Sequence, residues 1–307
     1  MFSPKTAVKL HGIEKACDHK HVKFGLAYAN AGPLGDPDFA IPLAQLAEEL
    51  GFESLWTVEH VVVPTGYSSP YPYSPDGKMP GGDQVAITDP LIWLAFVAAA
   101  TTTIRLATGI LILPQRNPLV LAKEVATLDR LSGGRVDLGI GVGWLREEFD
   151  ALGIPFERRG ARTDEYVDVM RRLWREPSTA FSGEFTEFAE LNSYPKPAGA
   201  EGVPIHIGGH SDAAARRAGR LGDGFFPGRG EGNGLEGLLE TMRTAAKEAG
   251  RDADAIEITS GGGLDLDSVK RSADLGVDRY TIPPLAYDLE NLRSRLGKFS
   301  ETIIAKS

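Results

Sequence analysis

"SGGRVDLGIGVGWLREEF", residues 132–149, decides which class of fold this chain has. Its glycines Gly139, Gly141 and Gly143 lie in and directly after a run of apolar and β-branched residues that indicates a strand. A dinucleotide-binding loop would need a further glycine where Trp144 stands, and a helix directly afterwards. Pro155 interrupts the segment that follows, so the stretch does not belong to that class of loop.

Alternate glycines remove the side chains from one face of a strand. Because successive residues of a strand point to opposite faces, the three glycines share a face. A bare face allows a flat ligand or another backbone segment to approach closely. It also suits the crowded interior of a barrel, and the sequence is compatible with both interpretations.

The stretch contains the fourth of eight short β-branched or aromatic runs that alternate with helical periods. These runs cover residues 22–29, 54–60, 104–112, 135–142, 204–209, 224–227, 255–260 and 278–283. The helical segments that follow them cover residues 38–50, 90–100, 118–131, 162–174, 211–221, 234–249, 267–275 and 289–304.

Eight strands that are each followed by a helix predict an α/β fold of the (β/α)8 TIM-barrel type, with a doubly wound sheet as the competing arrangement. We expect an N-terminal arm over residues 1–21 and a single barrel domain over residues 22–307. The loops 63–88 and 144–160 follow strands, and the active sites of barrels lie at that end. A further insertion, 176–199, is expected to hold a short hairpin.

The composition is that of an ordinary globular chain, with 307 residues of which 42% are hydrophobic. Its net charge of −9 gives no attraction for nucleic acid or an anionic membrane. Cys17 is the only cysteine, which fits a reducing compartment. The longest apolar run is too short for a membrane span, and the opening does not read as a signal peptide, so we expect a cytoplasmic protein. "CDHKH", residues 17–21, lacks a second ligand cluster, so no metal site is predicted.

Three stretches together resemble a known family. They are "LATGILILPQRNPLVLAKEVATLDRLSGGRVDLGIGVGWLREEFDALG" (106–153), "RRGARTDEYVDVMRRLW" (158–174) and "PIHIGGHSDAAARRAGRLGDGFF" (204–226). They resemble the luciferase-like monooxygenase superfamily, and within it the branch that depends on the deazaflavin coenzyme F420. The resemblance extends over residues 22–280 and implies a (β/α)8 barrel, in agreement with the strand count.

The resemblance implies a non-proline cis peptide at the end of the third strand, where it backs the deazaflavin ring. The matching bond is Gly109–Ile110, followed by Leu111. It also implies that His60, at the end of the second strand, lies close to the reactive face of the cofactor. An imidazole can give or take a proton near neutral pH as a hydride moves. Glu59 either orients this histidine or belongs to the barrel wall, and His60 itself could be a hydrogen-bonded residue of the barrel rim.

The resemblance further implies that the turn after the fifth strand holds the cofactor phosphate. Gly208, Gly209, His210 and Ser211 form this turn, and backbone N–H groups at a helix N-terminus bind anions. A plain turn with a serine helix cap is the other interpretation. Nearby cofactor-binding candidates are Gly141 and Val142 of the glycine run, and Arg146, which we expect to reach the phosphate or the acidic tail of the coenzyme.

One position departs from the F420-dependent sugar-phosphate dehydrogenases of this family. They have a glutamate where this chain has Trp144, which argues against sugar oxidation and for a more apolar substrate pocket. Aromatic residues of the second strand and the following loop are candidates to close this pocket, or to pack the loop: Trp56, Tyr67, Tyr71 and Tyr73.

We therefore expect an F420-dependent oxidoreductase that transfers a hydride between the deazaflavin and a small or medium organic molecule. The alternatives are an FMN-dependent monooxygenase of a two-component system, a non-catalytic protein that carries the flavin or deazaflavin, and an unrelated barrel lyase acting on a phosphorylated substrate. The resemblance also implies a homodimer formed through helices near the second and third strands.

Overall fold

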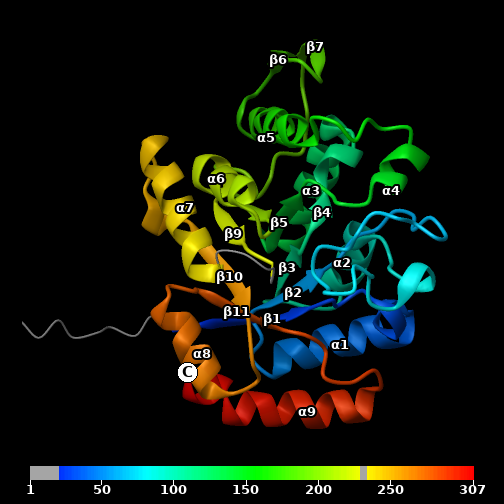
Figure 1. The fold of residues 1–307 in the computed structure, drawn as a ribbon, viewed down its shortest axis with the longest axis vertical. Helices are drawn as coiled ribbons and strands as arrows, with labels where there is room; N and C mark the ends of the chain where they lie inside the picture. Colours follow the sequence, from blue (N-terminus) through cyan, green and yellow to red (C-terminus); the bar gives the residue numbers. More distant parts are fainter. Residues whose placement is uncertain (1–20, 229–233) are drawn as a thin grey trace, which may run out of the picture.

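The computed structural model describes residues 21–228 and 234–307 and shows a closed barrel of parallel strands surrounded by helices (Figure 1). The sheet order is β3-β2-β1-β11-β10-β9-β8-β5-β4, and a further pairing of β3 with β5 closes it. The predicted TIM barrel is therefore confirmed, and the doubly wound sheet is excluded. The barrel strands are β1 (Lys23–Ala27), β2 (Ser54–Thr57), β3 (Arg105–Thr108), β4 (Leu111–Ile112), β5 (Val136–Gly141), β8 (Ile205–Gly208), β9 (Gly224–Phe226), β10 (Glu257–Gly261) and β11 (Arg279–Ile282).

The run predicted as one strand over 104–112 is divided into β3 and β4. The Gly109–Ile110 peptide bond between them is cis. Ala107 pairs with Asp137 and Leu111 pairs with Ile140, so this side of the ladder holds one more residue than its partner β5. An extra residue of this kind is a bulge, and it changes the direction of the strand at the rim of the barrel.

Nine α-helices occur in the described part of the chain, and eight of them agree with the sequence prediction to within a few residues. The ninth is α4, a short helix in the loop after β5. The helices are α1 (Pro37–Glu49), α2 (Pro90–Ala98), α3 (Pro118–Ser132), α4 (Arg146–Ala151), α5 (Arg159–Arg175), α6 (Asp212–Leu221), α7 (Gly234–Glu248), α8 (Leu266–Asp274) and α9 (Leu289–Thr302), with 3-10 turns at Gly32–Gly35, Gly82–Gln84, Leu113–Gln115, Ala253–Ala255 and Ile304–Lys306.

Helix boundaries follow local signals in the sequence. Asp89 precedes the proline that begins α2, and its carboxylate accepts hydrogen bonds from the N–H groups of Leu91 and Ile92. Gly133 ends α3 in the left-handed conformation, with φ of 74°, which a residue with a side chain rarely adopts. These signals explain why α2 begins and α3 ends close to where the sequence predicted.

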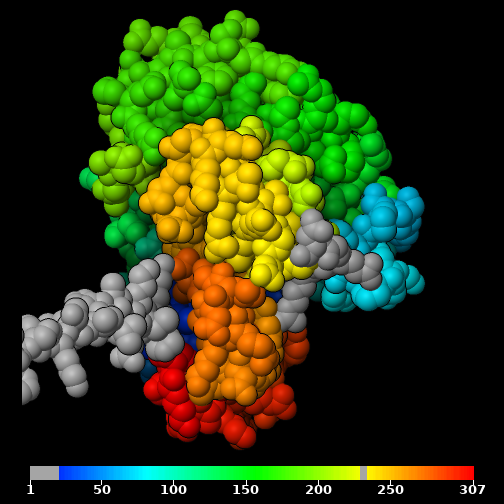
Figure 2. All heavy atoms as spheres, turned by 60° about the vertical axis from the view of Figure 1, so that its left-hand side comes forward, coloured from blue at the N-terminus to red at the C-terminus, as the bar shows by residue number. Residues whose placement is uncertain are grey.

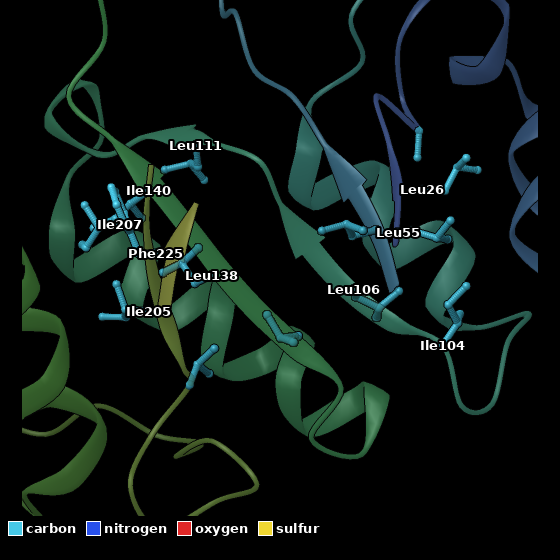
Figure 3. Close-up of a cluster of buried hydrophobic side chains, with 14 of the residues drawn as sticks. Leu26, Leu55, Ile104, Leu106, Leu111, Leu138, Ile140, Ile205, Ile207 and Phe225 are labelled. Carbon is cyan, nitrogen blue, oxygen red and sulfur yellow. The ribbon is translucent and has the colours of Figure 1, made fainter. Parts of the chain in front are cut away.

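The main hydrophobic core lies between the strands and the surrounding helices. Side chains from many strands contribute to it, including Leu26, Leu55, Leu106, Leu138 and Phe225 (Figure 3). Because successive strand residues alternate between faces, their neighbours point to the inside of the barrel.

The inside of the barrel is partly filled by a buried ionic cluster. Asp137 accepts a hydrogen bond of 2.6 Å from Arg105, and a nitrogen of Arg279 lies 3.7 Å from its other oxygen. Arg279 also binds Glu53 at 2.8 Å. Burial would raise the pKa of Asp137, but hydrogen bonds from Arg105 and His206 outweigh it and hold this pKa below its usual range.

Two insertions extend from the barrel. The segment before β8 forms the predicted hairpin, β6 (Thr179–Ser182) and β7 (Glu187–Leu191), which are antiparallel. The loop between β2 and α2, drawn in cyan, projects at the edge of the molecule beside the green segment that contains α4 (Figures 1 and 2). The predicted arm lies outside the described residues except for His21. Among the helices that the structure describes, none combines the length and apolar character needed to cross a bilayer.

Candidate active site

The three alternate glycines of β5 and its end receive the segment that carries the cis peptide. A Cβ atom on Gly139 would lie 1.8 Å from the backbone oxygen of Thr108, which is an impossible contact. A Cβ on Gly141 would lie 2.6 Å from the side chain of Ile110, and one on Gly143 would lie 2.8 Å from Ile112. The bare face of β5 is therefore filled by other parts of the chain, in agreement with the crowded barrel interior that the sequence allowed.

Ile110 is the side chain that occupies this bare face. Its Cδ1 atom lies against Gly141 and its Cγ2 atom against Gly208, each so close that an added Cβ would approach within 2.6 Å and 2.4 Å respectively. Ile110 therefore covers Gly141 and Gly208, and a ligand at this place would contact Ile110 and not the glycines. Gly109 is limited in the same way, since its Cβ would meet Phe226 at 2.8 Å.

Glu59 fixes the strand segment that follows the cis peptide. Its buried carboxylate accepts the N–H of Ile112 and forms an ion pair with Arg116, which also binds Asp89 at the start of α2. Within residues 21–228 and 234–307, its hydrogen bonds reach these partners and not His60. Glu59 is therefore part of the barrel wall and not the residue that orients His60.

His60 is oriented by Glu148 from α4. Nδ1 of His60 lies 3.0 Å from Oε2 of Glu148. The other oxygen, Oε1, accepts the backbone N–H groups of Val61 at 2.7 Å and Val62 at 3.3 Å. Glu148 is completely buried. The sequence analysis missed this residue, because α4 has only six residues and was taken as part of a loop.

The neighbouring carboxylate, Glu147, holds the next part of the loop. Its Oε1 accepts hydrogen bonds from the N–H of Ser68 at 2.7 Å, the Ser68 hydroxyl at 2.8 Å and the N–H of Ser69 at 3.1 Å. The hydrogen bonds from Ser69 and Ser68 lower the pKa of Glu147 to about 2. Two consecutive glutamates of α4 thus bind the beginning and the end of the segment 60–69.

A row of aromatic rings extends from His60 towards the turn after β8. Trp144 packs edge-on against His60 with ring centroids 5.6 Å apart, and Tyr71 lies 5.2 Å from Trp144. Tyr73 continues the row at 5.3 Å from Tyr71 and 4.8 Å from His210. Because β3 and β5 lie between β2 and β8 in the sheet, the row crosses part of the barrel mouth.

The phenol groups of this aromatic row are uncharged. Burial raises the pKa of both Tyr71 and Tyr73, so neither ionises near neutral pH. Tyr67 joins the row through Trp144 at 5.6 Å, and its hydroxyl accepts the N–H of Met79. Tyr67, Tyr71, Tyr73 and Trp144 therefore lie together, an arrangement that fits both the pocket and the loop packing that the sequence allowed.

Trp56 does not belong to this group. It is buried in the barrel interior, where its Nε1 donates to Ser54 at 2.8 Å and its ring packs against Phe226 at 5.0 Å. Arg279 of the ionic cluster lies 5.3 Å from the ring centroid. The strand period places Trp56 on the inner face of β2 and below the rim, so its prediction as a substrate-pocket residue is wrong.

The turn after β8 differs from the expected arrangement in one hydrogen bond. The N–H of Gly209 donates to the backbone oxygen of Phe226 at 3.2 Å, so it is already paired and does not point to a ligand. Ser211 caps α6 by accepting the N–H of Ala214 at 3.3 Å. The first N–H groups of a helix have no acceptor within the helix, so the start of α6 is the part of this turn that remains a candidate for anion binding.

His210 lies at this turn beside Tyr73. Its Nδ1 atom is buried and has no hydrogen-bond partner among the described residues. Burial lowers the pKa of His210, so the ring is neutral near pH 7. Asp212 follows in the first turn of α6, where it pairs with Arg216 at 4.0 Å.

Arg146 is not in contact with the turn. Its side chain is exposed, pairs with Glu157 at 2.8 Å and lies over the ring of Phe156 at 4.3 Å. Its backbone N–H donates to the hydroxyl of Ser69 at 3.3 Å. Val142 follows Gly141 at the end of β5 and is partly exposed. The structure thus brings Val142 to the barrel mouth and leaves the guanidinium of Arg146 on the surface.

No group of three His, Cys, Asp or Glu side chains suited to a metal ion occurs in residues 21–228 and 234–307. Cys17, Asp18, His19 and Lys20 of the sequence "CDHKH" lie outside the described residues.

Comparison with known proteins identifies the family of this barrel. The description "luciferase-like monooxygenase" applies to the family that matches residues 22–268, which is most of the chain. The chain belongs to the luciferase-like monooxygenase family. The family resemblance drawn from the sequence is confirmed, and an unrelated barrel lyase is excluded.

Members of the luciferase-like family with similar sequences include two bacterial proteins. An uncharacterized protein of Mycobacterium tuberculosis is 34% identical over 290 residues, which cover 92% of this chain and 100% of that protein. A protein named F420-dependent glucose-6-phosphate dehydrogenase, from Kineococcus radiotolerans, is 34% identical over 228 residues. That match covers 72% of this chain but only 61% of the Kineococcus protein.

Among solved structures, the coenzyme F420-dependent tetrahydromethanopterin reductase from Methanopyrus kandleri has a similar fold. Its TM-score is 0.73 at 18% sequence identity, with 93% of this chain and 99% of that chain covered. At this identity the similarity establishes the barrel fold alone. In this chain, the His60–Glu148 pair, the cis peptide and the aromatic row lie at one end of the barrel.

Proposed function

We propose that this luciferase-like protein is an oxidoreductase that uses coenzyme F420 to transfer a hydride to or from a small or medium apolar organic molecule. Two relatives at 34% and 32% identity are named F420-dependent glucose-6-phosphate dehydrogenases, which supports this choice of cofactor. Neither name identifies the substrate of this chain.

The observation that carries the proposal is the position of the Ile110 side chain between two strands. Ile110 lies against Gly141 at the end of β5 and Gly208 at the end of β8. Its side chain offers an apolar surface for a planar ring, and the start of α6 lies directly after the next turn. The residues therefore fit a cofactor that combines a flat ring with a phosphorylated tail.

Each part of the site would have a separate role in binding or in the reaction. Ile110 and its neighbours would support the ring, and the N-terminus of α6 would bind the phosphate. A bound deazaflavin would supply the two-electron hydride chemistry. His60 would exchange the proton that accompanies the hydride, and the aromatic row would exclude water from the reaction.

The aromatic row favours an uncharged substrate. None of the cation–π contacts within the described ranges involves Tyr67, Tyr71, Tyr73 or Trp144. The rings are neutral and no guanidinium or ammonium lies over them, so they provide no counter-ion for a sugar phosphate. A neutral apolar molecule would pack against these aromatic rings more favourably than a sugar phosphate.

Parallel titrations of the apo protein with F420 and with FMN test the choice of cofactor. We expect saturable quenching of F420 fluorescence and weaker binding of FMN. A protein that binds FMN tightly and has no measurable affinity for F420 would contradict the proposal.

An FMN-dependent monooxygenase of a two-component system is the second candidate, because the family description itself names monooxygenases. Reduced flavins react with dioxygen, whereas a deazaflavin mainly transfers hydride. Substrate turnover that consumes dioxygen with reduced FMN would favour this candidate. Turnover that continues with F420 under anaerobic conditions would favour the first.

A non-catalytic carrier of the cofactor is distinguished by His60→Ala. For an enzyme in which His60 moves a proton, we expect turnover to fall by about 10² or more, while cofactor affinity changes little. A carrier would show no turnover in either protein and equal affinity in both.

A further inference from the structure

Glu148 is a buried carboxylate whose place is fixed independently of any ligand. It has no exposed surface, and its Oε1 atom accepts two consecutive backbone N–H groups, from Val61 and Val62. An oxygen that accepts two backbone donors cannot turn away without losing both hydrogen bonds, and Glu148 is itself completely buried. The orientation of the second oxygen is therefore fixed as well.

That second oxygen, Oε2, lies 3.0 Å from Nδ1 of His60. A neutral imidazole carries one hydrogen, on either ring nitrogen, and its hydrogen-bond partner selects which. A carboxylate oxygen is an acceptor only, so it selects the form with the hydrogen on Nδ1.

We propose that Glu148 is the positioning residue that keeps the hydrogen of His60 on Nδ1 and leaves Nε2 as the proton acceptor of the site. In the part of the chain that the structure describes, no group forms a hydrogen bond with Nε2. The side chain of His60 is 8% exposed.

The consequence for the reaction rests on the proposed function. In the oxidation of an alcohol group, the C–H hydrogen would leave with its electron pair as a hydride, and a bound deazaflavin would supply the acceptor. The O–H proton passes to Nε2 of His60 and a C=O bond forms. The negative charge of Glu148 then stabilises the imidazolium. In the reverse direction, Nε2 returns the proton to the oxygen.

Glu148→Gln tests the assignment because the substituted amide keeps the size of the side chain but reverses one hydrogen bond. Its oxygen is held by the N–H groups of Val61 and Val62, so its NH₂ group faces Nδ1 of His60. Nδ1 then becomes the acceptor, and the hydrogen moves to Nε2.

The measurement is the ¹⁵N NMR spectrum of the histidine rings in apo protein at a pH of about 8.5, above the usual titration range of imidazole. His60→Ala assigns the signals of His60. We expect a protonated Nδ1 and an unprotonated Nε2 in the wild type, and the opposite in Glu148→Gln. A wild type protonated on Nε2, or on both nitrogens, would overturn the assignment even if the variant did not fold.

Glu147→Gln is the matched control. Glu147 is the adjacent residue of α4 and also accepts backbone N–H groups of the loop, but its partners are Ser68 and Ser69. We expect this variant to leave the hydrogen on Nδ1 of His60. A change of the same kind in both variants would mean that α4 acts only by holding the loop, which contradicts the proposal.

Kinetics separate this inference from the proposed function. In the F420-loaded enzyme, we expect Glu148→Gln to lower kcat by about 10² with a small change in KM, and Glu148→Asp to restore part of the loss. An unchanged kcat in a variant whose His60 hydrogen has moved from Nδ1 to Nε2 would refute the role of Nε2. If F420 does not bind, the proposed function fails while the NMR result stands by itself.

Discussion

Ile110 and the glycines around it form a tightly constrained contact at the barrel mouth. The side chain lies between two strands, and a single added carbon on Gly208 would approach it to 2.4 Å. Protein interiors are close-packed, so such a contact forces a shift of the side chain or of the strand. The position of Ile110 therefore depends directly on glycine at two places.

Gly208→Ala is predicted to destabilise the protein by about 1 to 3 kcal/mol, because its methyl group would overlap Ile110. It is also predicted to weaken F420 binding by more than the loss of thermal stability alone would cause, because Ile110 is the proposed support for the ring. Thermal unfolding and a fluorescence titration measure the two effects.

Gly297→Ala is the control for this substitution. Gly297 lies within α9, and nothing lies within 4 Å of the position of an added Cβ. Replacing a glycine inside a helix by alanine is expected to stabilise by about 0.5 to 1 kcal/mol. If both variants changed stability in the same direction, the tight contact at Ile110 would not be the cause.

At the residue scale, the family resemblance implied the cis peptide at Gly109–Ile110 and singled out His60, and the sequence indicated the loop aromatics. It did not locate Glu148, because the pairing with His60 joins residues 88 positions apart and leaves no local pattern. It placed Trp56 in the pocket, although Trp56 points to the interior of the barrel and is buried there. It predicted that Arg146 reaches the phosphate or the acidic tail of the cofactor, whereas Arg146 forms an ion pair with Glu157.

Among the elements, α4 and the loop it binds are the parts that distinguish this barrel from a plain repeat of strand and helix. Two consecutive glutamates of α4 hold the segment 60–69. The same loop continues to Tyr71, which packs against Trp144 in the aromatic row. Longer elements were predictable because eight strands and eight helices show their periods in the sequence. A six-residue helix and a strand divided after four residues do not show a period long enough to recognise.

The contact of α1 with the segment before β3 predicts a dependence of stability on pH. One oxygen of Glu48 accepts the N–H groups of Thr102, Thr103 and Ile104. Burial raises the pKa of Glu48, but these hydrogen bonds outweigh it and lower the pKa from 4.5 to about 2.

Because the folded-state pKa of Glu48 is depressed, its contribution to stability is present above pH 4.5 and is lost as the pH falls towards 2. Glu48→Gln keeps an acceptor oxygen but does not titrate. The free energy of unfolding of the wild type is predicted to fall more steeply than that of the variant in this window, as measured by urea unfolding at several pH values. Parallel pH profiles would count against the role of Glu48.

On the scale of the whole molecule, α2 presents an apolar face that the barrel does not cover. The helix is apolar all round, and its outer side chains Ile92 and Phe96 are 73% and 46% exposed. A face of this kind at a helix near the second and third strands fits the homodimer that we expect from the family resemblance.

We predict that Ile92→Asp shifts the protein from dimer to monomer in light scattering, since a buried carboxylate at an interface is costly. Leu264→Asp is the control, because Leu264 is 48% exposed and lies in the loop before α8. A wild type that is monomeric at all concentrations would refute the prediction.

The most direct test of the central claim is the structure of the protein with F420 bound. The claim is that the deazaflavin lies against the cis Gly109–Ile110 segment, at the end of the barrel where His60 and the aromatic row meet. We predict density for the ring in contact with Ile110 and for the phosphate at the N-terminus of α6. A ring bound elsewhere, with Ile110 and His60 both out of contact, would contradict the account.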